Sequence, residues 1–173
     1  RYLRSDVSVN INLETGVHTG GHAQGDTLTS IESIVGSTHS DTLRGSAGND
    51  TLFGDGGDDS LTGGLGFDQL YGGNDADTFI FEAITAFDNT NIIGDFDLAE
   101  GDIVDVSDIL TGYDPLVDLI ADFVQITDDG THSMLAVDAD GGADNFVQIA
   151  QLNNVTGLTD EDGLEASGNL IGV

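Results

Sequence analysis

The sequence contains no cysteine, no tryptophan, no lysine and a single proline among its 173 residues. Without cysteine, neither disulfide bonds nor thiolate metal sites can stabilise the fold. Only three Lys and Arg residues oppose 32 Asp and Glu residues, which gives a formal net charge of -29. This charge argues against nucleic acid and anionic membrane surfaces as partners. No apolar run is long enough to cross a bilayer, so we expect no membrane span. The composition favours cations as partners.

The beginning of the chain also lacks a secretory signal peptide, and it starts at Arg1 rather than at a methionine. We therefore expect a piece of a longer protein, with export information elsewhere. A charge this high can indicate disorder, but 38% of the residues are hydrophobic, and they recur with a period. In residues 1–35, the alternation of Val7, Val9, Ile11 and Leu13 predicts a half-buried strand. We expect this segment to form N-terminal strands and an irregular first coil.

Catalytic motifs are also absent from the sequence. It has no H-E-x-x-H zinc motif, no G-x-S-x-G nucleophile elbow and no G-x-x-x-x-G-K phosphate loop. His18 and His22 have the spacing of one helical turn, but Gly20 and Gly21 between them make a helix, and hence a zinc site, a poor interpretation. The chain is predicted not to be an enzyme.

A nine-residue repeat occupies residues 36–80. Each copy holds a glycine, then an aspartate five positions later, then a large apolar residue two positions after the aspartate. The glycines are Gly36, Gly45, Gly54, Gly63 and Gly72; the aspartates are Asp41, Asp50, Asp59, Asp68 and Asp77; the apolar residues are Leu43, Leu52, Leu61, Leu70 and Phe79. This spacing is the signature of a parallel β-roll, in which each copy forms a turn and a very short strand. The predicted fold is therefore an all-β parallel β-roll, or β-solenoid, in which two copies make one coil.

The stacked aspartates of such a roll predict metal binding. Coils stack at about 4.8 Å, and two carboxylates at that distance repel by about 3–4 kcal/mol at an effective dielectric constant near 20. A divalent cation between the turns reverses this effect. Ca²⁺ is the best candidate, because it accepts six to eight oxygens, backbone carbonyls included, whereas Mg²⁺ needs tighter geometry and Zn²⁺ prefers nitrogen and sulfur. We expect several calcium ions.

The predicted ligands are the side chains of the five repeat aspartates and backbone carbonyls of the turns. Asp41, Asp59 and Asp77 should lie on one edge, and Asp50 and Asp68 on the other. The candidate carbonyls belong to Gly36, Thr38, Gly45, Ala47, Gly54, Gly56, Gly57, Gly64, Gly66 and Gly73. The alternative, a glycine-rich linker, gives no reason for an apolar residue two positions after every aspartate.

Other acidic residues form weaker candidates. Asp26 repeats the Asp-x-Leu element ahead of the regular repeats. The loop that holds Asp138, Asp140 and Asp144 either binds another calcium ion or is a plain acidic hairpin turn. The turn with Asp95, Asp97, Glu100 and Asp102 is a further calcium candidate.

Residues 81–173 have a different character. Short apolar segments predict strands, which occur at 92–93, 103–104, 123–126, 134–137 and 146–152. One short helix is predicted at 116–123, after Pro115, and another from Thr159 to Gly168. We interpret this region as a capping region of short strands and one or two short helices.

The repeats resemble those of the RTX (repeats-in-toxin) family. "GSAGNDTLF", "GDGGDDSLT" and "GGLGFDQLY" match its nonapeptide closely, whereas His39 and Asp75 replace the glycine at the fourth position of their copies. The stretch "NIIGDFDLAEGDIVDVSDIL", followed by "LAVDADGGADNFVQIAQL" and "LEASGNLIGV", is similar to the C-terminal target region of type I secretion substrates, especially on large bacterial adhesins, ice-binding ones included.

This resemblance implies a calcium-binding module of a secreted adhesin, located outside the cell or on its surface. It also implies an uncleaved C-terminal signal, export by the type I secretion machinery, and folding only where calcium is plentiful. We expect the fragment to be a monomer. Two alternatives stay open: the tail of an extracellular protease or lipase, and a surface- or sugar-binding tip, for which Phe67 and Tyr71 are the aromatic candidates.

Overall fold

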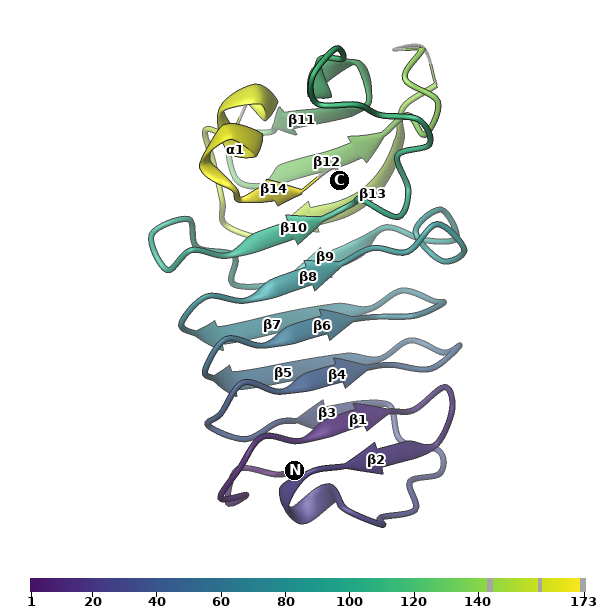
Figure 1. Ribbon diagram of the computed structural model, residues 1–173, viewed down its shortest axis with the longest axis vertical. Helices are drawn as coiled ribbons and strands as arrows, with labels where there is room; N and C mark the ends of the chain where they lie inside the picture. The colour runs from purple at the N-terminus through teal and green to yellow at the C-terminus, as the bar shows by residue number, and fades with distance from the viewer. Residues whose placement is uncertain (143–144, 159, 172–173) are drawn as a thin grey trace.

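The computed structural model describes residues 1–142, 145–158 and 160–171. The chain winds between two sheets that face each other, so that successive strands of the repeats alternate between the sheets (Figure 1). Sheet A has the order β14-β10-β8-β6-β4-β1-β2. Its strands, in chain order, are β1 (Asn10–Asn12), β2 (Val17–Thr19), β4 (Thr42–Arg44), β6 (Ser60–Thr62), β8 (Thr78–Ile80), β10 (Ile103–Asp105) and β14 (Leu170–Ile171).

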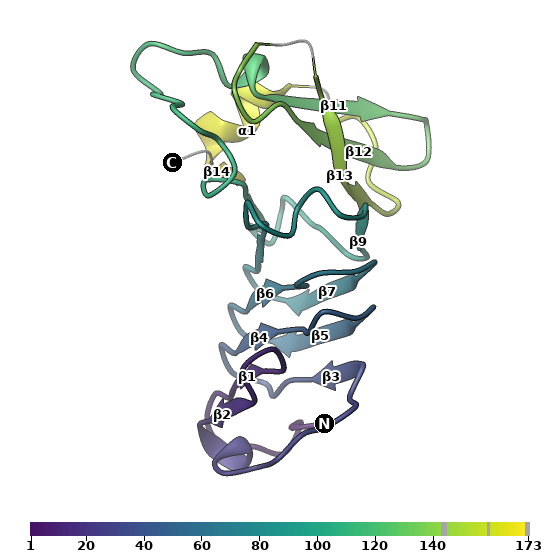
Figure 2. The ribbon, with the colours of Figure 1, turned by 90° about the vertical axis from the view of Figure 1, so that its right-hand side faces the viewer.

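Sheet B has the order β11-β12-β13-β9-β7-β5-β3. Its strands are β3 (Ser33–Val35), β5 (Thr51–Gly56), β7 (Gln69–Asn74), β9 (Asn91–Ile93), β11 (Val124–Asp128), β12 (Ser133–Val137) and β13 (Val147–Leu152). Seen from the side, the two sheets form an elongated stack, with the C-terminal strands gathered at one end (Figure 2).

The strands of the nonapeptides pair in parallel, each with the strand two repeats further along the chain. Leu43 lies opposite Leu61, Leu52 opposite Leu70, and Leu61 opposite Phe79. Two nonapeptides therefore make one coil, and the prediction of a parallel β-roll is confirmed.

The apolar residues of the repeats fill the space between the sheets. All five are at most 1% exposed, and Phe79 is fully buried. Burial of such a side chain contributes about 2–3 kcal/mol. β4 and β6 have three residues each, and the six-residue β5 continues into glycines, so each strand contributes one large apolar side chain to the core.

The parallel ladder continues on both sides of the nonapeptides. β1 pairs with β4, β9 with β7, and β10 with β8. A longer loop joins β8 to β9, so the partner of Leu70 in the next coil is Ile93 rather than the residue exactly two repeats later. β13 and β14 then extend the two sheets in parallel, while β11 and β12 add antiparallel pairs.

The α-helix α1 (Glu161–Ser167) lies where the sequence predicts it. The Asp160 side chain accepts a hydrogen bond from the Gly163 N–H, and Gly168 ends the helix with a φ of 83°. Both are standard capping arrangements.

The helix predicted at 116–123 is wrong apart from one 3₁₀ turn, η2 (Ile120–Asp122). The Asp114 carboxylate accepts the N–H of Leu116 at 2.9 Å, and the Asp114 carbonyl accepts the N–H groups of Val117 and Asp118, but this single turn does not continue into a helix. Leu116 is 89% exposed, so packing does not favour a helix there. The other 3₁₀ turn is η1 (Gly21–Ala23). Of the strand predicted from Val7, only β1 forms, and Val7 is half exposed.

No helix in the described ranges is long and apolar enough to cross a membrane.

Candidate calcium sites

The turns of the roll line two edges. The turns at 36–41, 54–59 and 72–77 lead from sheet B to sheet A, and those at 45–50 and 63–68 lead from sheet A to sheet B. Turns two repeats apart therefore stack on the same edge, and each edge carries a column of aspartates. The structure thus brings together the aspartates that the sequence pairs.

All five repeat aspartates are buried, with exposures between 0% and 2%. Carboxylates also tie successive coils together. The N–H of Asp41 donates to Oδ1 of Asp59 at 2.6 Å, and the N–H of Asp59 donates to Oδ1 of Asp77 at 2.8 Å. On the other edge, the N–H of Asp50 donates to Oδ1 of Asp68 at 2.9 Å. At these positions, a carboxylate oxygen therefore accepts the N–H of the previous coil, as a backbone carbonyl does in the strands.

The second carboxylate oxygen has no such partner in three turns. Oδ2 of Asp59, Asp68 and Asp77 is buried and accepts no hydrogen bond. A buried polar group without a partner is costly, and a buried carboxylate more so. A cation is the partner that suits a buried anionic oxygen.

The first glycine of each turn allows ligand oxygens of two coils to approach each other closely. A Cβ placed on Gly54 would overlap both Oδ2 of Asp59 and the carbonyl oxygen of Gly72 in the next coil. Gly45 is similar, because its Cβ would overlap the carbonyl oxygen of Gly63 and lie 2.8 Å from Oδ2 of Asp50. A carboxylate oxygen of one coil and a carbonyl oxygen of the next therefore face the same small space.

This donor set fits calcium. In the part of the chain that the structure describes, no three His, Cys, Asp or Glu side chains gather to hold a metal ion. One carboxylate per turn must therefore be supplemented by backbone carbonyls, which Ca²⁺ accepts readily and Zn²⁺ does not. The predicted carbonyl donors Gly57, Gly64, Gly66 and Gly73 have φ values of 91°, 101°, 106° and 111°, a left-handed backbone that favours glycine.

In the first turn on each edge, a serine donates hydrogen bonds to the aspartate carboxylate, which the later turns lack. The N–H and Oγ of Ser37 donate to the Asp41 carboxylate at 2.5 and 2.9 Å. The N–H and Oγ of Ser46 donate to Oδ2 of Asp50 at 2.6 and 2.9 Å. Asp50 keeps an unpartnered Oδ1, whereas both oxygens of Asp41 are bonded.

The two nonglycine residues at the fourth position also differ. Asp75 adopts a φ of 76° and accepts the N–H of Gly57 at 3.2 Å, so its turn keeps the left-handed backbone of the neighbouring turns. His39 has no positive φ, and its N–H donates to the Ser37 hydroxyl at 3.2 Å. The turn with Asp75 therefore retains the geometry of the turns that contain Gly57 and Gly66, whereas His39 shares the lack of a positive φ with Gly48, at the same position of the next turn.

Three aspartates of the columns hold their protons more tightly than an exposed carboxyl group does. Burial raises the pKa of Asp59 from 3.8 to about 8, that of Asp77 to about 7 and that of Asp68 to about 6. In each case the backbone N–H from the previous coil lowers the pKa, and neighbouring carboxylates raise it further. Desolvation, rather than repulsion along the column, is therefore the larger cost of ionising these groups.

Two residues outside the nonapeptides extend the columns. The prediction from sequence omitted Asn91 and placed Asp102 only in a separate candidate calcium turn. Asn91 accepts the N–H of Asp68 at 2.8 Å through Oδ1. Asp102 accepts the N–H of Asp77 at 3.0 Å and, with its other oxygen, the N–H of Asp97 at 2.8 Å. Both stand two positions before a buried apolar residue, Ile93 and Val104. This spacing from a polar to an apolar residue is the signal that could have found them.

The remaining candidates have different surroundings. Asp26 is exposed and accepts the Tyr2 hydroxyl at 2.9 Å. Asp138 is buried just after β12, Asp140 is exposed, and Asp144 lies outside the described residues. Thr38 and Ala47 are exposed at the tips of their turns, and Gly56 is the last residue of β5. In the turn after β9, Asp95 accepts the N–H groups of Gly72 and Gly73, whereas Asp97 and Glu100 are exposed.

Comparisons with known proteins agree with this geometry. The model of the RTX calcium-binding nonapeptide repeat matches residues 35–70 and 54–83. The solution structure of the AlgE6R3 subunit of the Azotobacter vinelandii mannuronan C5-epimerase is 30% identical, with a TM-score of 0.55. The match covers 82% of this chain and 77% of that one. No curated protein matches the chain by sequence.

The fold and the turns thus define a calcium-binding β-roll module. The chain belongs to the RTX calcium-binding repeat family.

Proposed function

We propose that the edge turns bind calcium through the carboxylates of Asp59, Asp68 and Asp77 and through turn carbonyls of adjoining coils. The observation that carries this proposal is the unpartnered, fully buried Oδ2 atom in each of the three turns. Asp50 is a ligand of the same kind through its unpartnered Oδ1, whereas both oxygens of Asp41 are bonded, so Asp41 must first release one of them. The carbonyls of Gly36, Gly45 and Gly54 complete the set.

Calcium binding should be coupled to folding. Without the ion, each column buries carboxylates that favour protonation, so ionisation at neutral pH opposes the folded state. A ligand that binds only the folded chain stabilises it by mass action, and a site assembled only by folding contributes its binding free energy to folding. We therefore infer a chain that is open where calcium is scarce and folded where it is plentiful.

This switch suits a secreted protein. RTX repeats are typical of secreted proteins, and the resemblance of the C-terminal region to type I secretion substrates supports export by that machinery. The chain would leave the cell unfolded and fold outside. We infer an extracellular adhesin as the parent protein.

One alternative parent is supported by the comparison. The similar AlgE6R3 module is a subunit of an epimerase, so this chain is equally able to form the tail of an extracellular enzyme such as a protease or lipase. The presence or absence of a catalytic domain in the parent protein distinguishes the two. A sugar- or surface-binding tip is the third candidate, and Phe67, which is 38% exposed, is its aromatic residue on the turns.

Circular dichroism and calorimetric titration of the whole chain test the calcium proposal. Strand signal should be lost with excess chelator and return with millimolar calcium. Asp59→Asn should bind fewer ions than the unaltered chain, whereas Asp122→Asn, an exposed change in η2 far from the edges, should bind the same number. Equal strand signal with chelator and with calcium contradicts the proposal.

A further inference from the structure

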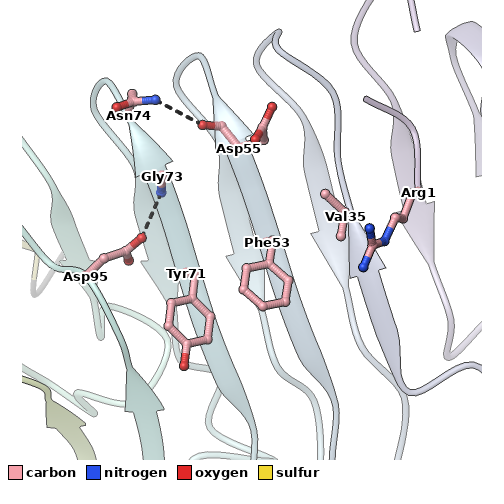
Figure 3. A pocket seen from close by; sticks show the side chains of 8 residues that line it. All are labelled: Arg1, Val35, Phe53, Asp55, Tyr71, Gly73, Asn74 and Asp95. Atoms are coloured by element: carbon pink, nitrogen blue, oxygen red, sulfur yellow. Dashed lines mark hydrogen bonds between the residues drawn. The ribbon is translucent and has the colours of Figure 1, made fainter. Parts of the chain in front are cut away.

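The outer face of sheet B carries an open groove that the calcium proposal does not use. Its volume is about 530 Å³. Figure 3 shows the side chains that line it, which come from the N-terminus, from β3, β5 and β7, and from the turn after β9. The lining residues are Arg1, Val35, Phe53, Asp55, Tyr71, Gly73, Asn74 and Asp95.

The floor of the groove is a flat apolar ladder. Val35 lies in register with Phe53, and Phe53 with Tyr71. The two rings are nearly parallel, at an angle of 12°, with centroids 4.7 Å apart. A Cβ on Gly94 would overlap the Tyr71 ring, so the absence of a side chain there leaves room for the ring at the end of the ladder.

The equivalent face of sheet A has no such floor. At the same strand positions, Arg44 lies opposite Thr62, and Ile80 is the last residue of β8, the next strand of this sheet. The Arg44 guanidinium there donates to both carboxylate oxygens of Glu82, at 2.6 and 2.7 Å, and is thereby occupied. The open aromatic surface is therefore particular to sheet B.

Carboxylates stand beside this floor. Asp95 is fixed near Tyr71, because its two oxygens accept the N–H groups of Gly72 and Gly73 at 3.0 and 3.1 Å (Figure 3). A carboxylate has about four acceptor positions, so Asp95 can accept further hydrogen bonds. Asp55 stands on the turn side of Phe53, next to Asn74.

Asp55 is also held in a strained conformation. Its φ is 90°, whereas the same position of the next two turns holds Gly64 and Gly73 at 101° and 111°. An L-residue in this region costs about 1–2 kcal/mol. The other such residue in the turns, Asp75, uses its side chain to accept a backbone N–H; within the described residues, the Asp55 side chain makes no hydrogen bond of this kind. Hydrogen bonding within the described residues thus gives no reason for a carboxylate at position 55.

A guanidinium already lies at one end of the groove. The Arg1 side chain extends beside Val35, beyond the two rings (Figure 3). A planar guanidinium can stack on an aromatic face while it donates to carboxylates, and a simple ammonium ion does this less well. The net charge of -29 attracts cationic partners to the surface as a whole.

The geometry points to a second binding site: the groove over Phe53 and Tyr71 binds an arginine side chain of a basic partner protein. The rings contact the guanidinium plane and its alkyl stem, and Asp55 and Asp95 accept its N–H groups. The groove adjoins the edge turns and includes Gly73, but the carboxylates of Asp59, Asp68 and Asp77 do not line it, so this site can fail while the calcium proposal holds.

An NMR titration of the calcium-loaded chain with N-acetyl-arginine-N-methylamide tests the site at constant ionic strength. The largest amide shifts are expected at Phe53, Asp55, Tyr71 and Gly73, and the matched neutral probe N-acetyl-glutamine-N-methylamide should cause none. Tyr71→Thr should weaken binding of the arginine probe about fivefold. Ile80→Thr, the same kind of change on the outer face of sheet A, should leave it unchanged.

The variant Asp55→Gly distinguishes a loss of arginine binding from a loss of stability, because the two effects should have opposite signs. This variant should raise the melting temperature, because it removes the strained φ, and should weaken binding of the arginine probe. The site is refuted if the probe shifts the edge turns as much as the groove, or if Asp55→Gly and Tyr71→Thr bind as tightly as the unaltered chain. It is equally refuted if methyl glucoside, a neutral sugar probe, shifts the same amides while the arginine probe does not.

Discussion

Asp77 joins two coils with one carboxylate oxygen and leaves the other without a partner. Its Oδ1 accepts the N–H of Asp59 at 2.8 Å, while its Oδ2 is buried and accepts nothing. The same division holds at Asp59 and Asp68. One atom of each side chain therefore belongs to the backbone ladder, and the other is available to a cation.

The two kinds of turn predict unequal losses of calcium. Asp59→Asn removes an unpartnered anionic oxygen, whereas Asp41→Asn removes one that Ser37 already satisfies. We expect Asp59→Asn to weaken calcium binding by a larger factor than Asp41→Asn, on the order of tenfold or more. Isothermal titration calorimetry of the two variants measures this. Equal losses would contradict the distinction between the turns.

Gly54 is predicted to be required for space rather than for backbone freedom. It has no positive φ, but a Cβ there would overlap Oδ2 of Asp59 and the Gly72 carbonyl. Gly54→Ala should therefore abolish calcium-dependent folding, as measured by circular dichroism during a calcium titration. Gly48→Ala is the matched control, because its Cβ would meet nothing closer than Ser46 Oγ at 3.7 Å. A Gly54→Ala chain that folds at the usual calcium concentration would show that the space is not needed.

Acid should partly replace calcium. Burial raises the pKa of Asp59, Asp77 and Asp68 to about 8, 7 and 6, above the ordinary value of 3.8. The folded state therefore holds more protons than the unfolded state between these values, and its stability falls as pH rises through that window. In excess chelator, the chain should be most structured near pH 4 and should lose structure towards pH 8.

Urea titrations with chelator at several pH values measure this dependence. With saturating calcium the trend should reverse, because the ion binds the ionised carboxylate and competes with the proton. A chelated chain that gains stability between pH 4 and pH 8 would contradict the burial argument.

Arg44 is predicted to stabilise the roll through ion pairs that do not involve calcium. Its guanidinium bonds Glu14 from the loop after β1 and Glu82 from the loop after β8, so it spans several strands of sheet A. Arg44→Met should lower the free energy of unfolding by about 1–2 kcal/mol, since part of the interaction is screened by solvent. Thermal denaturation at fixed calcium measures this loss. Arg4→Met, an exposed change, should have a negligible effect.

The regular part of the fold could be predicted because each position of the repeat has one physical role. The apolar position sets the core, the aspartate column sets the edge, and the spacing of nine sets the coil. Leu43, Leu61 and Phe79 therefore stack as expected. The spacing of nine does not lead to Asn91 and Asp102, because they follow loops of other lengths. Like the repeat aspartates, each accepts a backbone N–H from the previous coil.

Other features depend on contacts that no local pattern records. The loop after Pro115 has apolar residues at plausible helical spacing, but several of them remain exposed, and Asp114 closes a local turn instead. Likewise, the difference between the turns arises from a serine hydroxyl that reaches the carboxylate at the end of its own turn. The sequence shows the serine, but only the structure shows which oxygens it leaves unsatisfied.

Crystallography with anomalous scattering from calcium tests the central claim most directly. Crystals of the whole chain grown with calcium should show ions on both edges, each about 2.3–2.6 Å from Oδ2 of Asp59, Asp68 or Asp77 and from turn carbonyls. Absence of anomalous peaks at these three carboxylates, in crystals that contain calcium elsewhere, would contradict the account.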